Sequence, residues 1–155
     1  MKLTLRIIIL SLLLNLQWTP AQSATYNVAP KFGQCFMHSL ADVDASHPQK
    51  NPISCSKSHN AEIIKVSRWP SSIEPTLMEY EDAWNLANSI CGFEGGAASR
   101  LKRSHFNYWA WYTPSSAAWA NGERWLRCDG MFISNLSTAK TFENYKFRTW
   151  TGRRV

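Results

Sequence analysis

The stretch LMEYEDAWNLANSIC, residues 77–91, decides the fold class because it is the clearest periodic segment of the chain. Its apolar and aromatic residues recur at steps of three and four, which is the spacing of one face of an α-helix. These residues are Leu77, Tyr80, Trp84, Ala87 and Cys91. Gly92 follows directly and predicts that the helix ends there. We therefore expect one main helix that brings Cys91 into a core at its last turn.

The segments on both sides of this helix have the composition of β-strands, with β-branched and aromatic side chains between polar breaks. The predicted strands are residues 31–37, 61–69, 106–112, 124–133 and 141–150. Residues 41–52 are polar and predict a loop, and residues 114–119 predict a short turn of helix. Because strands, one helix and further strands follow each other, the sequence predicts an α+β fold: a small antiparallel sheet with one main helix.

Four cysteines, Cys35, Cys55, Cys91 and Cys128, predict that two disulfides staple this fold. No two of them form a C-x-x-C pair, so the spacing excludes a zinc ribbon or a thioredoxin-like motif. Three connectivities are possible, and the sequence alone does not choose between them. We favour Cys35–Cys55 with Cys91–Cys128, because each pair joins segments that can lie together.

The amino terminus has the three parts of a secretory signal. Lys2 and Arg6 precede a short apolar run, and the small residues Ala21, Ser23 and Ala24 follow it. The run is about half the ~20 residues that a membrane-spanning helix needs, although a retained anchor is the alternative. We expect a signal peptide at residues 1–24, one domain at residues 25–155, and a secreted or extracytoplasmic protein with no stable membrane span after cleavage.

The charge of the chain is mildly basic. Two of the 17 basic residues and none of the 11 acidic ones lie in the predicted signal, so the rest of the chain has 15 basic residues and a net charge of +4. This charge is too weak and too scattered to predict nucleic-acid binding. It suits a negatively charged surface such as an anionic envelope polymer or a membrane face, and ordinary solubility is the alternative interpretation. We expect no cofactor.

His59 and Glu62 are the most suggestive polar pair. A histidine beside a carboxylate can act in acid–base catalysis or supply two metal ligands. Two ligands are too few for a structural zinc site, so we predict no metal site. In the structural interpretation, His59 caps a turn and Glu62 accepts its hydrogen bond.

The aromatic concentration supplies the candidate binding residues Trp109, Trp111 and Trp119, and Arg124 is the fourth candidate binding residue. Aromatic faces suit the apolar faces of sugars, but a domain of this size also needs large side chains in its core. Arg124 can stack on Trp119 or pair with Glu62. In an extended chain Phe106, Tyr108 and Tyr112 lie on one side of segment 106–112, and Trp109 and Trp111 lie on the other.

Several short motifs resemble those of the septum-formation domain, a family of exported or membrane-attached actinobacterial proteins. Gly33-Gln34-Cys35-Phe36 is similar to its G-D-C-F motif, with Gln34 in place of Asp. Cys55 and His59-Asn60-Ala61-Glu62 are similar to its V-x-C-x-x-x-H-x-A-E motif. The closing landmarks follow in the same order as in the family: they are Pro114, Trp119, Gly122, Arg124 and Cys128. The resemblance covers residues 32–131.

The resemblance implies a non-enzymatic domain of the cell envelope that binds an envelope component or a protein partner and is linked to septum formation. One alternative is a small secreted hydrolase or metal-dependent enzyme that uses His59 and Glu62. Another is a secreted effector whose basic tail, with Arg153 and Arg154, contacts a host or membrane surface.

Overall fold

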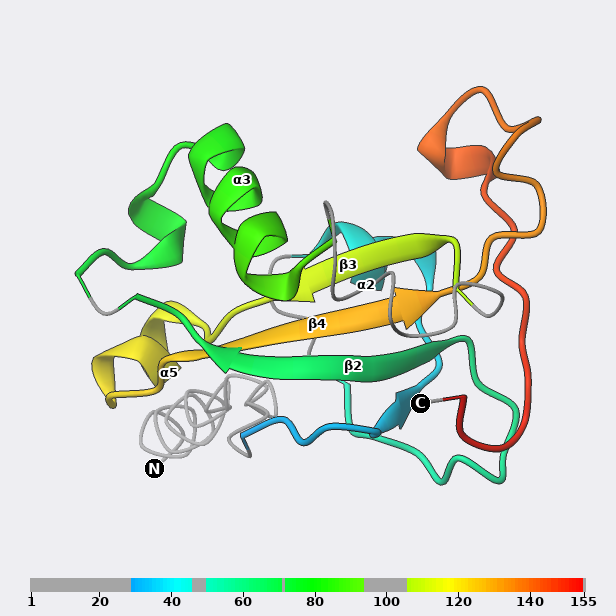
Figure 1. The fold of residues 1–155 in the computed structure, drawn as a ribbon, viewed down its shortest axis with the longest axis horizontal. Coiled ribbons are helices and arrows are strands. Elements are labelled where there is room, and N and C mark those ends of the chain that lie inside the picture. Colours follow the sequence, from blue (N-terminus) through cyan, green and yellow to red (C-terminus); the bar gives the residue numbers. More distant parts are fainter. Residues whose placement is uncertain (1–28, 46–49, 71, 94–105, 155) are drawn as a thin grey trace, which may run out of the picture.

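The computed structural model describes residues 29–45, 50–70, 72–93 and 106–154, so the predicted signal peptide lies outside the described residues. Four antiparallel strands form one sheet in the order β1-β2-β4-β3, as Figure 1 shows. The strands are β1 (Cys35–Phe36), β2 (Ala61–Arg68), β3 (Tyr108–Tyr112) and β4 (Trp125–Met131). The predicted α+β class with an antiparallel sheet is confirmed.

The main helix, α3 (Tyr80–Cys91), ends as predicted at Gly92, whose φ of 76° is left-handed. Its buried face, however, differs from the predicted one: it consists of Ala83, Ala87, Asn88 and Cys91. Leu77 lies in the preceding 3₁₀ turn η1 (Pro75–Leu77) and is 77% exposed, and Tyr80 is 76% exposed. Small residues let the helix approach the sheet closely, which leaves the larger aromatic side chains on the neighbouring stripe.

Two short helices flank the sheet. The helix α5 (Ser116–Ala120) is confirmed where the sequence predicts it, and the Ser115 side chain caps it. The helix α2 (Leu40–Asp44) overlaps residues 41–52, which were expected to form a loop, so that part of the prediction is wrong. The helix forms because Ser39 and Asp42 make a reciprocal capping box, which satisfies the free N–H groups of a short helix.

Two apolar layers lie on opposite faces of the sheet. One contains α3 and includes Ile64, Leu126 and Cys128; the other includes Phe36, Ile63 and Met131. Ile63 and Ile64 reach different layers because successive side chains of a strand point to opposite faces of the sheet. The register of β2 against β4 shifts directly after Ile63, as at a β-bulge.

Phe106 does not share a face with Tyr108 and Tyr112, contrary to the strand prediction. The chain bends at Asn107, before β3 begins, so Phe106 packs in the α3 layer. Its ring lies edge-on to Trp109, with 6.0 Å between centroids.

The last predicted strand, residues 141–150, is also wrong. The segment contains the 3₁₀ turn η2 (Phe142–Asn144) and two isolated bridges, Ile133 to Phe147 and His59 to Trp150. Because the two bridges have partners on different segments, the chain crosses the end of the sheet instead of running beside one strand. Segment 31–37 likewise contributes only β1 to the sheet, since Gly33 has a left-handed φ of 75°.

Both disulfides have the favoured connectivity. Cys35–Cys55 ties β1 to the next loop, and Cys91–Cys128 ties the end of α3 to β4. In the chain-entropy model, loops of this size stabilise the fold by about 3–4 kcal/mol each. Among the described residues, no helix has the length and apolar character needed to span a bilayer. Two disulfides are compatible with an extracytoplasmic location.

Candidate functional site

A cleft of about 750 Å³ runs along β3, the outer strand of the sheet. One wall comes from η1 and α3, and the other from the end of α2, whose Val43 packs in the opposite layer. Figure 1 shows α3 lying over the sheet beside β3. The cleft therefore opens between two helices that belong to opposite faces, and the edge strand lies between them.

Two of the four predicted binding residues line this cleft, namely Trp109 and Trp111. Both also contribute to the core, because Trp109 stacks on Phe93 at 5.4 Å and Trp111 on Trp69 at 5.9 Å between ring centroids. Each is partly buried. The two alternatives for these tryptophans are therefore not exclusive: one part of each indole packs the core and another lines the cleft.

The other two predicted binding residues lie elsewhere. The Arg124 guanidinium sits 3.7 Å from the Trp119 ring centroid and donates to the Trp119 carbonyl at 2.7 Å. The expected stacking is therefore confirmed. Pairing of Arg124 with Glu62 is wrong, because Arg124 adjoins the far end of β2, where Arg68 pairs with Trp125.

Sequence reasoning missed the aromatic side chains that α3 contributes to the cleft. Tyr80 and Trp84 line it and are 76% and 39% exposed. The sequence feature that could have identified them is their position on the helical stripe next to the small residues Ala83 and Ala87. An exposed aromatic pair beside a small-residue packing face is unusual for a surface helix and points to a ligand-facing wall.

Polar groups in and next to the cleft are strongly desolvated. Thr113 lines it, is 1% exposed, and its hydroxyl has no hydrogen-bond partner among the described residues. Burial, followed by the nearby Tyr145, Tyr80 and Asp44, raises the pKa of Tyr108 to about 12. The Tyr108 hydroxyl therefore stays protonated at neutral pH and can donate a hydrogen bond.

A buried charge network lies under β3 and β4. Arg127 Nε donates to Asp129 Oδ1 at 2.7 Å, and a second Arg127 nitrogen donates to Oδ2. His38 Nε2 lies 3.2 Å from Asp129 Oδ2, and the Asn60 side chain bonds the His38 backbone twice, at 2.7 Å. Burial raises the pKa of Asp129, but Arg127 and His38 outweigh it and hold that pKa below its usual range.

This network is a structural one, because its members are inaccessible. His38, Arg127 and Asp129 are 3%, 2% and 0% exposed. The Arg127 guanidinium also lies 3.8 Å from the centroid of the Phe36 ring. This network could not be predicted from the sequence, because Arg127 and Asp129 alternate with Leu126 and Cys128 as on a strand with one face in water.

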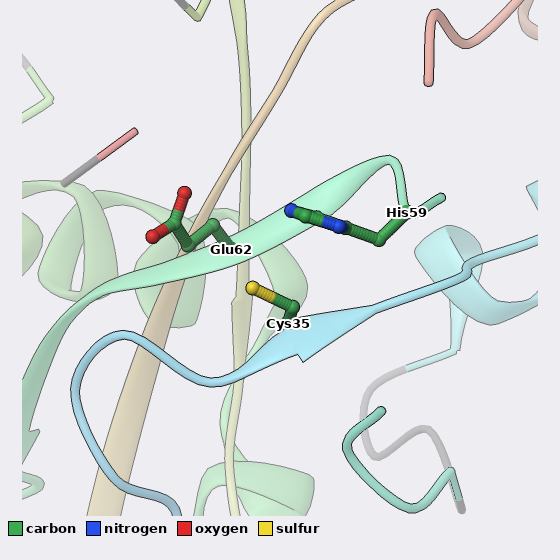
Figure 2. Close-up of side chains that lie close together, drawn as sticks. All are labelled: Cys35, His59 and Glu62. Atoms are coloured by element: carbon green, nitrogen blue, oxygen red, sulfur yellow. The ribbon is translucent and has the colours of Figure 1, made fainter. Parts of the chain in front are cut away.

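His59 and Glu62, the predicted polar pair, do lie close together. Figure 2 shows their side chains close to that of Cys35, with the His59 ring pointing toward the strand that carries Glu62. His59 Nδ1 lies 2.8 Å from the Lys57 carbonyl, so the histidine does bond within its turn, but not to Glu62 as expected. Glu62 Oε2 instead accepts a hydrogen bond from the Arg154 backbone N–H at 2.8 Å.

Both side chains of this pair are 0% exposed. A substrate cannot reach them in this conformation, which argues against acid–base catalysis at the pair. Cys35 is held in its disulfide and offers no thiolate, so the three groups do not make a metal site in the oxidised protein.

The chain matches no protein-family model, and no curated protein or solved structure is significantly similar to it. A function therefore has to be inferred from the chemistry of its own residues.

Proposed function

We propose that the protein is an exported, non-enzymatic binding domain that holds an extended segment of a partner protein in the cleft beside β3. The observation that carries this proposal is the position of the cleft: it follows the outer edge of the sheet between a helix from each face. An extended peptide is the ligand that matches the backbone of an edge strand.

The edge of β3 supports this choice of ligand. β3 pairs only with β4, and no backbone hydrogen bond joins it to another segment within the part of the chain that the structure describes. On such an edge, alternate N–H and C=O groups point away from the sheet. Five residues of β3 span about 17 Å, so an added strand of similar length would satisfy these groups.

The side chains of the cleft favour a peptide with apolar and basic residues. An added strand would place alternate side chains toward Trp109 and Trp111 on one face and toward Tyr108 on the other. Asp44 is the one acidic residue among the described lining residues, and none of these is basic. In a chain of net charge +6, this local excess of acid supports a cationic ligand segment.

The proposed partner is a protein of the cell envelope. The predicted signal peptide and the two disulfides support an extracytoplasmic site of action. The resemblance of residues 32–131 to the septum-formation domain supports an envelope partner at the division septum.

The experiment is a selection of random peptides of about ten residues on the purified mature domain, followed by calorimetry with the selected peptides. Tyr80→Ala and Trp84→Ala each remove an exposed side chain from the cleft wall, and we expect each to weaken binding at least tenfold. Leu77→Ala is the matched control, because Leu77 is as exposed as Tyr80 but does not line the cleft.

Hydrogen exchange of the β3 amides distinguishes strand addition from other modes of binding. We expect outward-facing β3 amides to exchange fast in the free protein and slowly in the complex. Fast exchange in both states, or peptides that bind all three variants equally, would refute the proposal. So would binding of glycan polymers but not of any peptide.

A further inference from the structure

The chemical state of the His59 ring is set by its neighbour. The Lys57 carbonyl can only accept a hydrogen bond, so His59 Nδ1 carries the proton and donates it at 2.8 Å. Nε2 therefore holds a lone pair. It is buried and has no hydrogen-bond partner among the described residues, an arrangement that destabilises the folded protein. A histidine that ligates a metal has the same arrangement, with one nitrogen donating to a backbone carbonyl and the other available.

The groups near this lone pair are metal ligands. A ligand atom of His59, the Cys35 sulfur and a Glu62 carboxylate oxygen all lie within 4.8 Å of one another. Figure 2 shows the His59 ring and the Cys35 sulfur directed toward the strand at Glu62, whose carboxylate extends to the other side and would have to rotate toward them to share an ion. Cys55 is bonded to Cys35, with 5.3 Å between their Cα atoms, so its sulfur lies next to this cluster of three and is the nearest fourth donor to the Cys35 sulfur.

Tetrahedral zinc needs ligand atoms about 3.3–3.8 Å apart, given Zn–N and Zn–S distances of about 2.0–2.3 Å. The cluster is therefore at most about 1–1.5 Å wider than such a site requires. Small side-chain rotations can close that gap. Two thiolates, one imidazole and one carboxylate would complete the four ligands that the sequence motif alone did not supply.

We propose that the reduced protein binds one soft divalent cation, of the Zn²⁺ class, through Cys35, Cys55, His59 and Glu62, and that formation of the Cys35–Cys55 disulfide expels it. A small dithiol supplies the two electrons and two protons that convert the disulfide to two thiols, and is itself oxidised to a disulfide. The cation then displaces the two thiol protons. A small-molecule disulfide reverses the change: it takes two electrons from the thiolates and two protons from solvent, becomes a dithiol, and the re-formed Cys35–Cys55 disulfide releases the cation.

The two disulfides differ in their access to a reductant. Cys55 is partly exposed, whereas Cys91 and Cys128 are 2% and 0% exposed. An incoming thiolate can therefore attack the Cys55 sulfur, with Cys35 as the leaving group, while Cys91–Cys128 is still protected. Within the described part of the chain, Cys91–Cys128 also lies in no cluster of three candidate ligands.

The remainder of the cluster is held in place without the disulfide. The backbone of His59 exchanges two hydrogen bonds with Trp150, at 3.0 and 2.8 Å, and its ring lies edge-on to the Trp150 ring at 4.9 Å. The Arg154 N–H orients the Glu62 carboxylate. Such outer partners fix ligand geometry in metal sites.

The test is a Co²⁺ titration of the mature protein at graded dithiol concentrations, with free thiols counted by alkylation and mass spectrometry. Once two thiols appear on Cys35 and Cys55, we expect one equivalent of Co²⁺ to give thiolate charge-transfer and tetrahedral absorption bands that Zn²⁺ abolishes. His59→Ala should lower the Zn²⁺ affinity at least 10–100-fold, since loss of an outer partner alone has that effect. The double variant Cys35→Ala/Cys55→Ala, reduced at its remaining disulfide, is the matched control and should bind no cation.

Three results would overturn the proposal. The oxidised protein could bind Co²⁺ as tightly as the reduced one, or His59→Ala could bind Zn²⁺ like the parent. The reduced protein could also unfold and fail to regain its circular dichroism when Zn²⁺ is added. The proposed peptide cleft is not involved in any of these measurements.

Discussion

Replacing Asp129 by Asn should destabilise the domain severely, because it removes the carboxylate from the buried ion pair with Arg127. The side chains of Arg127 and Asp129 are 2% and 0% exposed and share two hydrogen bonds. Breaking a buried ion pair from one side costs about 3–5 kcal/mol. Against a total stability of about 5–15 kcal/mol, the loss is large enough to measure in any two-state unfolding experiment.

A double-mutant cycle distinguishes the interaction energy of the Arg127–Asp129 pair from the cost of a general packing defect. Arg127→Met should cost about as much as Asp129→Asn, whereas the double variant should cost much less than their sum, with a coupling energy of about 3 kcal/mol. Urea unfolding under non-reducing conditions measures all four proteins. Lys50→Met is the matched control: it breaks the Lys50–Asp42 pair, where Lys50 is 40% exposed, and should cost about 0–1 kcal/mol.

The pH dependence has a defined sign. The pKa of Asp129 is lowered in the folded protein, so its contribution to stability is complete above the unfolded pKa of about 4 and is lost as the pH falls through the folded value. Below about pH 4, the parent should therefore lose stability more steeply than Asp129→Asn. Parallel slopes for the two proteins, or additive costs in the cycle, would refute the buried-pair reasoning.

Three further outcomes follow from single contacts. Gly130→Ala should cost about 1–3 kcal/mol in thermal unfolding, because its new Cβ would lie 2.8 Å from the Phe106 ring; an unchanged melting temperature would contradict the packing at Phe106. Ser39→Ala should cost about 1 kcal/mol through loss of the α2 capping box, and Ser39→Thr, which keeps the capping hydroxyl, should recover most of it. Tyr108→Phe should leave the tyrosinate absorbance unchanged up to about pH 10, since the pKa of Tyr108 is about 12; a smaller signal in the variant would show that Tyr108 ionises earlier.

Features with a local cause could be predicted from the sequence. The helix before Gly92 follows from periodicity and from the freedom of glycine at positive φ. The stacking of Arg124 on Trp119 is also local, because only five residues separate them. Each of these features depends on residues that are close together in the sequence.

Features with a distant cause could not be predicted. Arg127 and Asp129 alternate with apolar residues, which indicates a strand face in water, but His38 from a segment 89–91 residues away covers them. The stripe of α3 that faces the sheet was misassigned for a similar reason. Periodicity predicts that the segment is a helix. Whether Ala83 or Trp84 lies on its inner face depends on how closely the sheet approaches the helix.

The part of the candidate site that lies on β3 could be predicted from the sequence, and the part on α3 could not. Trp109 and Trp111 were identified because five aromatic residues cluster in seven positions, and aromatic density is visible in sequence. The α3 wall was missed because it joins β3 only through the tertiary fold. His59 and Glu62 were identified as a pair, but their third neighbour, Cys35, comes from β1, opposite Glu62 in the sheet.

The order of the strands makes the two proposals separable in one experiment. β1, with Cys35, and β3, beside the cleft, are the opposite edges of the sheet, so about 14 Å of strand spacing lies between them. Reduction of Cys35–Cys55 with cation uptake should therefore leave peptide affinity unchanged. Cys91–Cys128 behaves differently, because it ties α3, a wall of the cleft, to β4. Stronger reduction, which also breaks Cys91–Cys128, should loosen that wall and weaken peptide binding. A loss of peptide affinity on reduction of Cys35–Cys55 alone would contradict this placement of the two sites.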